Sequence, residues 1–216
     1  MEKERSLLIV FLRYPEVGRV KTRMAVGLGA EKACAIYGEL VRRTLVAVAE
    51  ASAVNRLQVW LYFDPPERGL ELREWLDIHQ LLNSFELISQ PVGDLGSRLE
   101  YAFSQAFTAG FARVCVIGTD CPALTSAHLQ AAFAALTHSE VVIGPATDGG
   151  YYLLGQRRFL PALFREIPWS SPHTFGATYR AAAEAGISIE IMPALDDIDT
   201  AEDWQRWISQ PDAAPL

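Results

Sequence analysis

The pattern of apolar and polar positions divides the chain into short apolar runs and longer amphipathic stretches. Ser6–Leu12 is apolar almost throughout, as expected for a strand that is covered on both faces. From Ala30 to Ala51 apolar residues recur at helical spacing, which predicts a long amphipathic helix. The alternation of such segments along the chain predicts a three-layer α/β/α fold with a mainly parallel, Rossmann-like sheet.

The same reading places the remaining elements. The other predicted strands are Leu57–Phe63, Phe85–Ser89, Arg113–Ile117, Glu140–Ile143, Tyr151–Leu154 and Ile187–Met192. The other predicted helices are Leu70–Leu76, Gly96–Phe107, Ser126–Leu136, Thr174–Ala185 and Ala201–Ile208. The segment that carries Pro15, Gly18, Gly27 and Gly29 is expected to be a loop. Because no stretch resembles a linker or a repeat, we expect one domain over residues 1–216.

Composition and charge narrow the functional class. The 216 residues carry a formal net charge of -7, which argues against a nucleic-acid partner. The apolar run Leu7–Leu12 is too short for a signal core or a membrane span, so we expect a cytoplasmic protein. The cysteines Cys34, Cys115 and Cys121 lack zinc-type spacing, and no histidine stands near Cys121 to activate it. The oligomeric state stays open.

Asp120 stands directly after the apolar strand Arg113–Ile117. In open parallel sheets ligands bind outside the carboxyl ends of the strands, so this carboxylate is placed to hold a metal or a polar substrate. The alternative is a helix cap. Thr125 or Ser126 can cap the next helix instead, which leaves Asp120 available for chemistry.

The segment after the first strand is rich in cations, with four of them between Arg13 and Arg23. In an acidic protein this clustering favours an anionic ligand such as a nucleotide phosphate, and Gly18 lets backbone amides approach it. The pair Lys21-Thr22 does not form a P-loop, because Val20 stands where that motif requires glycine. A solvated basic loop is the alternative.

Two further segments contain glycines beside charged residues. Gly93–Arg98 places glycines and a cation at a predicted helix start, where free amides bind anions; an ordinary helix start is equally compatible. Gly144–Tyr152 follows another strand and places Asp148 before two glycines, which let a ligand approach the backbone. A plain hairpin turn is the alternative for Asp148-Gly149.

The last predicted strand is followed by an acidic run, Leu195–Asp203. Asp199 or Thr200 can cap the terminal helix, but this leaves Asp196 and Asp197 without a structural explanation. Carboxylates this close repel one another unless a cation joins them. Oxygen ligands without histidine or cysteine suit Mg²⁺ or Mn²⁺.

Taken in order, these motifs resemble a family of bacterial transferases with the nucleotide-diphospho-sugar transferase (GT-A-like) fold, the radical-SAM/selenodomain-associated transferase 1 type. The layout is also similar to the guanylyltransferases of coenzyme F420 synthesis and, more distantly, to molybdenum-cofactor nucleotidyltransferases. The resemblance covers nearly the whole chain and rests on Phe11–Arg23, Asp94–Arg98, Gly118–Pro122, Gly144–Tyr152, Trp169–Ser171 and Asp197–Asp203. The chain departs from the family pattern at Arg13, Met24, Cys121 and Ser171.

The resemblance implies a metal-dependent transferase that takes a nucleotide-activated donor and a small-molecule acceptor. A glycosyltransferase that uses a nucleotide sugar is the first expectation; a nucleotidyltransferase that joins a nucleoside triphosphate to a phosphorylated acceptor is the second. A noncatalytic nucleotide-binding module is the third. The implied nucleotide-binding residues are Arg13, Gly18, Lys21, Thr22, Arg23, Gly96 and Arg98; the implied ligands of Mg²⁺ or Mn²⁺ are Asp120, Asp197 and Asp199. The expected substrate-binding residues are Asp148, Gly149, Gly150 and Tyr151, and the expected catalytic residues are Asp120, Lys21 and Asp148. No residue stands out as a general base; Asp148 is our choice if the reaction needs one, and a purely structural role is its alternative.

Overall fold

The computed structural model describes residues 4–81 and 85–210, and within them a single sheet has the strand order β3-β2-β1-β4-β6-β5-β7. The strands are β1 (Ser6–Arg13), β2 (Gln58–Asp64), β3 (Phe85–Ser89), β4 (Arg113–Ile117), β5 (Val141–Pro145), β6 (Tyr151–Gln156) and β7 (Ile189–Ile191). Neighbouring strands are parallel except for β6, which runs antiparallel to both β4 and β5. The predicted α/β fold with a mainly parallel sheet is therefore confirmed.

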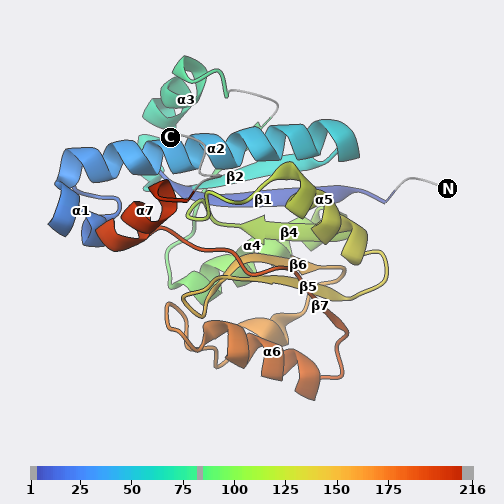
Figure 1. Ribbon diagram of the computed structural model, residues 1–216. Helices are drawn as coiled ribbons and strands as arrows, with labels where there is room; N and C mark the ends of the chain where they lie inside the picture. The colour runs from blue at the N-terminus through green and yellow to red at the C-terminus, as the bar shows by residue number, and fades with distance from the viewer. Residues whose placement is uncertain (1–3, 82–84, 211–216) are drawn as a thin grey trace.

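Helices alternate with these strands along the chain, except that a turn alone joins β5 to β6 (Figure 1). They are α1 (Thr22–Leu28), α2 (Ala30–Asn55), α3 (Gly69–Ile78), α4 (Leu95–Thr108), α5 (Ser126–Ala135), α6 (Thr174–Glu184) and α7 (Ala201–Ile208), with 3-10 turns at Pro66–Arg68 and Pro161–Phe164. Within the described ranges, none of the helices combines the length and the apolarity needed to cross a membrane.

Helix α1 corrects the prediction of a loop between the first strand and the first long helix. The helix has seven residues, too few for a clear apolar period, and it contains Gly27. The reason for this glycine is packing: a Cβ at this position would lie 2.8 Å from the Cβ of Ala201 in α7. Met24 is fully buried in a small cluster with Ile198 and Trp204. Tertiary contacts therefore stabilise a helix that local pattern did not reveal.

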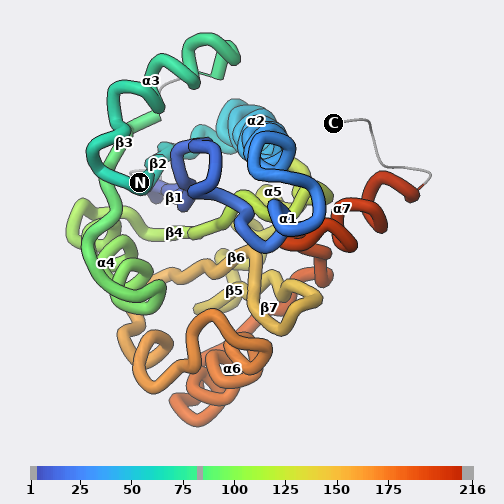
Figure 2. The backbone as a smooth tube through the Cα atoms, turned by 90° about the vertical axis from the view of Figure 1, so that its left-hand side faces the viewer, coloured from blue at the N-terminus to red at the C-terminus, as the bar shows by residue number. Residues whose placement is uncertain are grey.

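The apolar character of β1 follows from its position between two helical layers. Leu8 and Val10 pack with residues of α2, α3 and α5, whereas Leu7 and Ile9 pack with residues of α4 on the opposite face. Figure 2 shows α2 and α5 on one side of the strands and α4 on the other. The sheet is therefore the middle of the three predicted layers.

The carboxyl ends of β1, β4 and β5 lie at one edge of the sheet, because these strands run in the same direction. The segments that precede α1 and α7 meet at this edge, and the two helices lie side by side (Figures 1 and 2). The backbone N–H of Ile198 donates to the carbonyl of Asp120 at 2.9 Å. The topology thus brings three distant segments, around residues 21, 120 and 198, to one place.

Candidate active site

Two adjoining cavities open at the carboxyl edge of the sheet. The larger has a volume of about 640 Å³ and lies between the end of β1, the end of β4 and the start of α4. The smaller has a volume of about 480 Å³ and lies against the turn between β5 and β6. Eight of the described residues line both cavities and form their shared border, and Arg23, Asp120 and Asp199 are its charged members. Each volume lies in the range typical of small-molecule sites.

Lys21 is the most tightly held charged group at this border. Its Nζ lies 2.6 Å from a carboxylate oxygen of Asp120 and 2.7 Å from one of Asp199, and its side chain is only 5% exposed. Burial disfavours the charged amine, but the attraction of Asp120 and Asp199 outweighs it and holds the pKa of Lys21 above its ordinary value. The ammonium group therefore stays charged and joins two carboxylates that are far apart in sequence.

The backbone of Lys21 is in the left-handed conformation, with φ of 47°, at the N-cap of α1. Such a conformation is uncommon for a residue with a side chain and is maintained by surrounding contacts. The neighbouring Arg23 forms a further ion pair with Asp199. The cations of the predicted phosphate-binding loop thus converge on the carboxylates predicted to hold a metal.

Four carboxylates line the smaller cavity, and we call them the carboxylate cluster: Asp120, Asp148, Asp197 and Asp199. Arg23 is the only cationic residue among the described residues that line this cavity. Burial, followed by the nearby charges of Asp148 and Asp199, raises the pKa of Asp197 to about 6. The cluster therefore carries an excess of negative charge that Lys21 and Arg23 compensate only in part.

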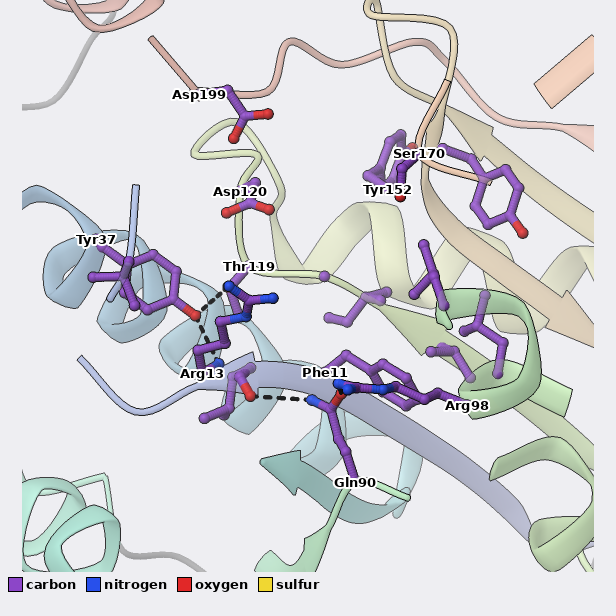
Figure 3. A pocket seen from close by; sticks show the side chains of 18 of the residues that line it. Phe11, Arg13, Tyr37, Gln90, Arg98, Thr119, Asp120, Tyr152, Ser170 and Asp199 are labelled. Carbon is purple, nitrogen blue, oxygen red and sulfur yellow. Dashed lines mark hydrogen bonds between the residues drawn. The ribbon is translucent and has the colours of Figure 1, made fainter. Parts of the chain in front are cut away.

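The donor set of this cluster fits a hard divalent cation, because it offers carboxylate oxygens and an excess of negative charge. Among residues 4–81 and 85–210, however, no three histidine, cysteine or acidic side chains are already arranged to hold a metal ion. At Asp120 and Asp199 the Nζ of Lys21 lies between the two carboxylates. Figure 3 shows these two carboxylates at the same end of the larger cavity.

Most of the residues predicted to bind the nucleotide line the larger cavity, namely Arg13, Lys21, Thr22, Arg23 and Arg98. Gly18 and Gly96 are not among the residues that line either cavity. Gly18 has φ of 79° and lies in a turn where an added Cβ would meet no atom. At Gly96 a Cβ would overlap the indole ring of Trp169, so this glycine serves close packing.

The residues predicted to bind the substrate lie in the turn between β5 and β6. Asp148, Gly150 and Tyr151 line the smaller cavity, whereas Gly149 does not. Gly149 has φ of 90°, and a Cβ there would collide with the carbonyl of Pro172. The backbone N–H of Gly150 donates to Asp148 at 2.7 Å, as in a tight turn. Asp148 and Gly149 therefore do form the hairpin turn that was the alternative to a ligand site, and the same turn also places Asp148 at the cavity.

Sequence reasoning missed two residues that organise the larger cavity. The hydroxyl of Tyr37 in α2 accepts the backbone N–H of Arg13 at 2.8 Å and lies 3.4 Å from the hydroxyl of Thr119. Gln90 is buried, and its amide nitrogen donates to the carbonyls of Leu12 and Tyr62. Gln90 could have been noticed as a polar residue directly after a strand, whereas Tyr37 is indistinguishable from a core residue of its helix.

Cys121 is buried beside the carboxylate cluster. Burial, and next the charge of Asp120, raise the pKa of the Cys121 thiol well above its ordinary value. The thiol is neutral at physiological pH, so it is poorly suited to act as a nucleophile.

A family model described as "uncharacterized protein conserved in bacteria" (DUF2064) matches residues 47–171, more than half of the chain. The chain belongs to the DUF2064 family. The matched region includes Arg98, Asp120 and Asp148, whereas Lys21 and Asp199 lie outside it. No curated protein matches the chain.

Solved structures with the same fold match this DUF2064 protein over nearly its whole length. A protein of Desulfovibrio desulfuricans G20, provisionally described as a nucleotide-diphospho-sugar transferase, is 29% identical with a TM-score of 0.87, over 97% of this chain and 89% of that one. The 4-diphosphocytidyl-2C-methyl-D-erythritol synthase of Anaerococcus prevotii is 10% identical with a TM-score of 0.62, over 93% and 94%. Rv0371c of Mycobacterium tuberculosis H37Rv, in complex with manganese, is 14% identical with a TM-score of 0.54, over 94% and 97%. The predicted nucleotide-diphospho-sugar transferase type of fold is therefore confirmed.

Proposed function

We propose that the protein is a transferase that binds a nucleotide-activated donor in the larger cavity and the transferred group with its acceptor in the smaller one. The observation that carries this proposal is the shared border, where Arg23, Asp120 and Asp199 line both cavities. A diphosphate at this border would contact Lys21 and Arg23, which supply the positive charge that it requires. The fold shared with the D. desulfuricans protein supports the same class of reaction.

The chemistry of the smaller cavity favours a sugar over a phosphorylated acceptor. Its carboxylate cluster would repel a second phosphate group, and Arg23 is its only cation in the described part of the chain. Sugar hydroxyls donate hydrogen bonds to carboxylates, and sugar ring faces pack on aromatic side chains such as Tyr152 and Trp169, which line this cavity. We therefore place a glycosyltransferase that uses a nucleotide sugar ahead of a nucleotidyltransferase.

The carboxylate cluster would hold Mg²⁺ or Mn²⁺ through Asp120, Asp197 and Asp199. When bound, this metal would supply positive charge for the diphosphate oxygens. Rv0371c, which has the same fold, was solved in complex with manganese. For Lys21, metal binding implies that its ammonium group gives up at least one of its two carboxylate partners.

In the proposed reaction the chain's own residues bind and orient the donor, and one of them accepts a proton. Lys21 and Arg23 hold the diphosphate in place, and their charges stabilise it as it leaves. The acceptor oxygen forms a bond to the anomeric carbon while the bond from that carbon to the diphosphate breaks. Asp148, which lines the smaller cavity, accepts the proton of the acceptor hydroxyl. The products are the glycosylated acceptor and a nucleoside diphosphate.

The test combines binding and product analysis. Nucleotide sugars, nucleoside diphosphates and nucleoside triphosphates are each mixed with the protein and Mg²⁺, Mn²⁺ or EDTA, and the melting temperature is measured. We expect nucleotide sugars and nucleoside diphosphates to raise the melting temperature when metal is present, and to raise it less when EDTA is present. Lys21→Met is expected to abolish the shift. Lys32→Met, at an exposed position that lines neither cavity, should retain it.

The leaving group separates the rival functions. Release of nucleoside diphosphate from a nucleotide sugar supports the proposal. Release of inorganic diphosphate from a nucleoside triphosphate would show a nucleotidyltransferase instead. Binding without any product, for every donor and a broad panel of polyhydroxylated acceptors, would favour a noncatalytic nucleotide-binding module.

A further inference from the structure

The two ends of the larger cavity differ in the side chains that line them. Asp120 and Asp199 lie at one end in Figure 3, whereas Gln90, Arg98 and Phe11 lie at the other. Gln90 and Arg98 line only the larger cavity, whereas Asp120 and Asp199 also line the smaller one. If the proposed function is correct, the diphosphate of the donor lies at the border, and its base therefore lies at the end that contains Arg98.

Arg98 is held in one orientation by neutral hydrogen-bond acceptors. Its Nε donates to the carbonyl of Gly93 and its Nη1 to the side-chain oxygen of Gln90, both at 2.9 Å. Among the described residues, Asp64 is the only one with a carboxylate oxygen within 4.0 Å of the guanidinium group of Arg98, and this oxygen lies 3.9 Å from Nη1. The guanidinium group is thus aligned without being fully neutralised by a partner.

Gln90 fixes the orientation of the Arg98 guanidinium group. Its amide nitrogen donates to the carbonyl of Tyr62 at 2.9 Å and to that of Leu12 at 3.2 Å, so the amide oxygen must face Arg98. Gln90 is only 8% exposed, which leaves it little freedom to turn. The ends of β1 and β2 therefore set the direction of the arginine on α4.

Part of the guanidinium edge is left for a ligand. No hydrogen bond joins the Nη2 of Arg98 to any residue within 4–81 and 85–210, and Arg98 lines the cavity. Phe11 and Leu99 line the same end and offer apolar surface to a planar ring. An arginine has donors only, so it selects a ligand edge that presents acceptors.

We infer that Arg98 reads the base of the nucleotide donor and selects a base with a keto oxygen, which means uracil, thymine, cytosine or guanine. The unpaired guanidinium edge would donate to this oxygen, as arginine does to the O6 and N7 atoms of guanine in nucleic acids. Adenine has no keto oxygen: its N1 and N7 acceptors each stand beside the amino group, a donor that would face the donors of Arg98. Gln90 is the positioning residue of this contact.

The test measures dissociation constants by calorimetry, with Mg²⁺ present, for UDP, dTDP, CDP, GDP, ADP and inorganic diphosphate. We expect at least one keto-base nucleotide to bind on the order of 10- to 100-fold more tightly than ADP. In Arg98→Gln this preference should disappear, while the affinities for ADP and for inorganic diphosphate stay within about twofold. Arg98→Lys keeps the charge but not the planar fork, and it should lose the preference as well.

Arg73→Gln serves as the control, because Arg73 is exposed on α3 and lines neither cavity. If ADP binds to the native protein as tightly as every keto-base nucleotide, the inference is wrong, although the proposed function survives. If Arg98→Gln weakens the binding of inorganic diphosphate as much as the binding of the preferred nucleotide, Arg98 binds phosphate and the inference is also wrong. If no nucleotide binds the native protein, the proposed function and the inference fail together.

Discussion

The two cavities share a border but differ in charge. The larger adds Arg13, Lys21 and Arg98 to the charged residues of the border, whereas the smaller adds the carboxylates Asp148 and Asp197. An anionic ligand with a planar base suits the first, and a neutral ligand with many hydroxyl groups suits the second. The difference is the reason for the proposed division of the donor, with its nucleotide in the larger cavity and its transferred group in the smaller one.

The difference follows from topology. The larger cavity is built where the parallel strands β1 and β4 end and where α4 begins. The smaller is built mainly by the hairpin of β5 and β6 and by the segments before α6 and α7.

The largest effect is expected from Lys21→Met, because Lys21 joins two carboxylates at the shared border. Donor turnover should fall about 100- to 1000-fold, as when one preorganised donor is lost from an active site. In the absence of metal, the free energy of unfolding should fall by about 1–2 kcal/mol, because Asp120 and Asp199 lose their common partner but are partly exposed to solvent. Product release and urea unfolding measure the two effects, with Lys32→Met as the control. Behaviour like that of the control would show that Lys21 does not organise the border.

Asp148→Asn tests whether the two cavities act separately. Turnover should fall about 100-fold, because the proposed proton acceptor is lost from the smaller cavity. The affinity for nucleoside diphosphate should change little, since this ligand occupies the larger cavity. Asp196→Asn is the matched control: Asp196 accepts a hydrogen bond from Thr147 and lines neither cavity. A large loss of diphosphate affinity in Asp148→Asn would contradict the separation.

Gly96→Ala tests the contact between α4 and the wall of the smaller cavity. The added methyl group would overlap the indole of Trp169, so the free energy of unfolding should fall by about 1–3 kcal/mol. Gly176 also lies in a helix, but an added Cβ there would meet no atom within 4 Å. Gly176→Ala should therefore be neutral or stabilise by up to about 1 kcal/mol. Thermal denaturation compares the two variants, and equal losses would argue against the Trp169 contact.

The helix caps are features that neighbouring residues in the sequence could predict. Thr125 or Ser126 was expected to cap the helix after Asp120, and Thr125 does so in a capping box with His128, so Asp120 is not used as a cap. Asp199 or Thr200 was expected to cap the terminal helix, and Thr200 does so in a capping box with Asp203, which leaves Asp199 to contact Lys21. These interactions span only three residues, so residue order was enough to narrow each cap to two neighbouring residues.

The roles of the glycines could not be predicted in the same way. Gly96 and Gly149 were assigned to ligand binding, yet they accommodate Trp169 and the carbonyl of Pro172. Both contacts join segments that are distant in sequence. A glycine required for close packing and one required for a ligand look the same in a sequence, because in both cases the feature is a missing side chain.

The sequence by itself determined the strands, the long helices and the residue types that gather at the carboxyl edge, because burial and capping act over a few neighbouring residues. Only the tertiary structure decided that α1 is a helix, that Lys21 joins Asp120 and Asp199, and that Gln90 aligns Arg98. These contacts bridge up to 178 positions of sequence, as between Lys21 and Asp199. They arise because the parallel strands end at one edge and bring distant segments together.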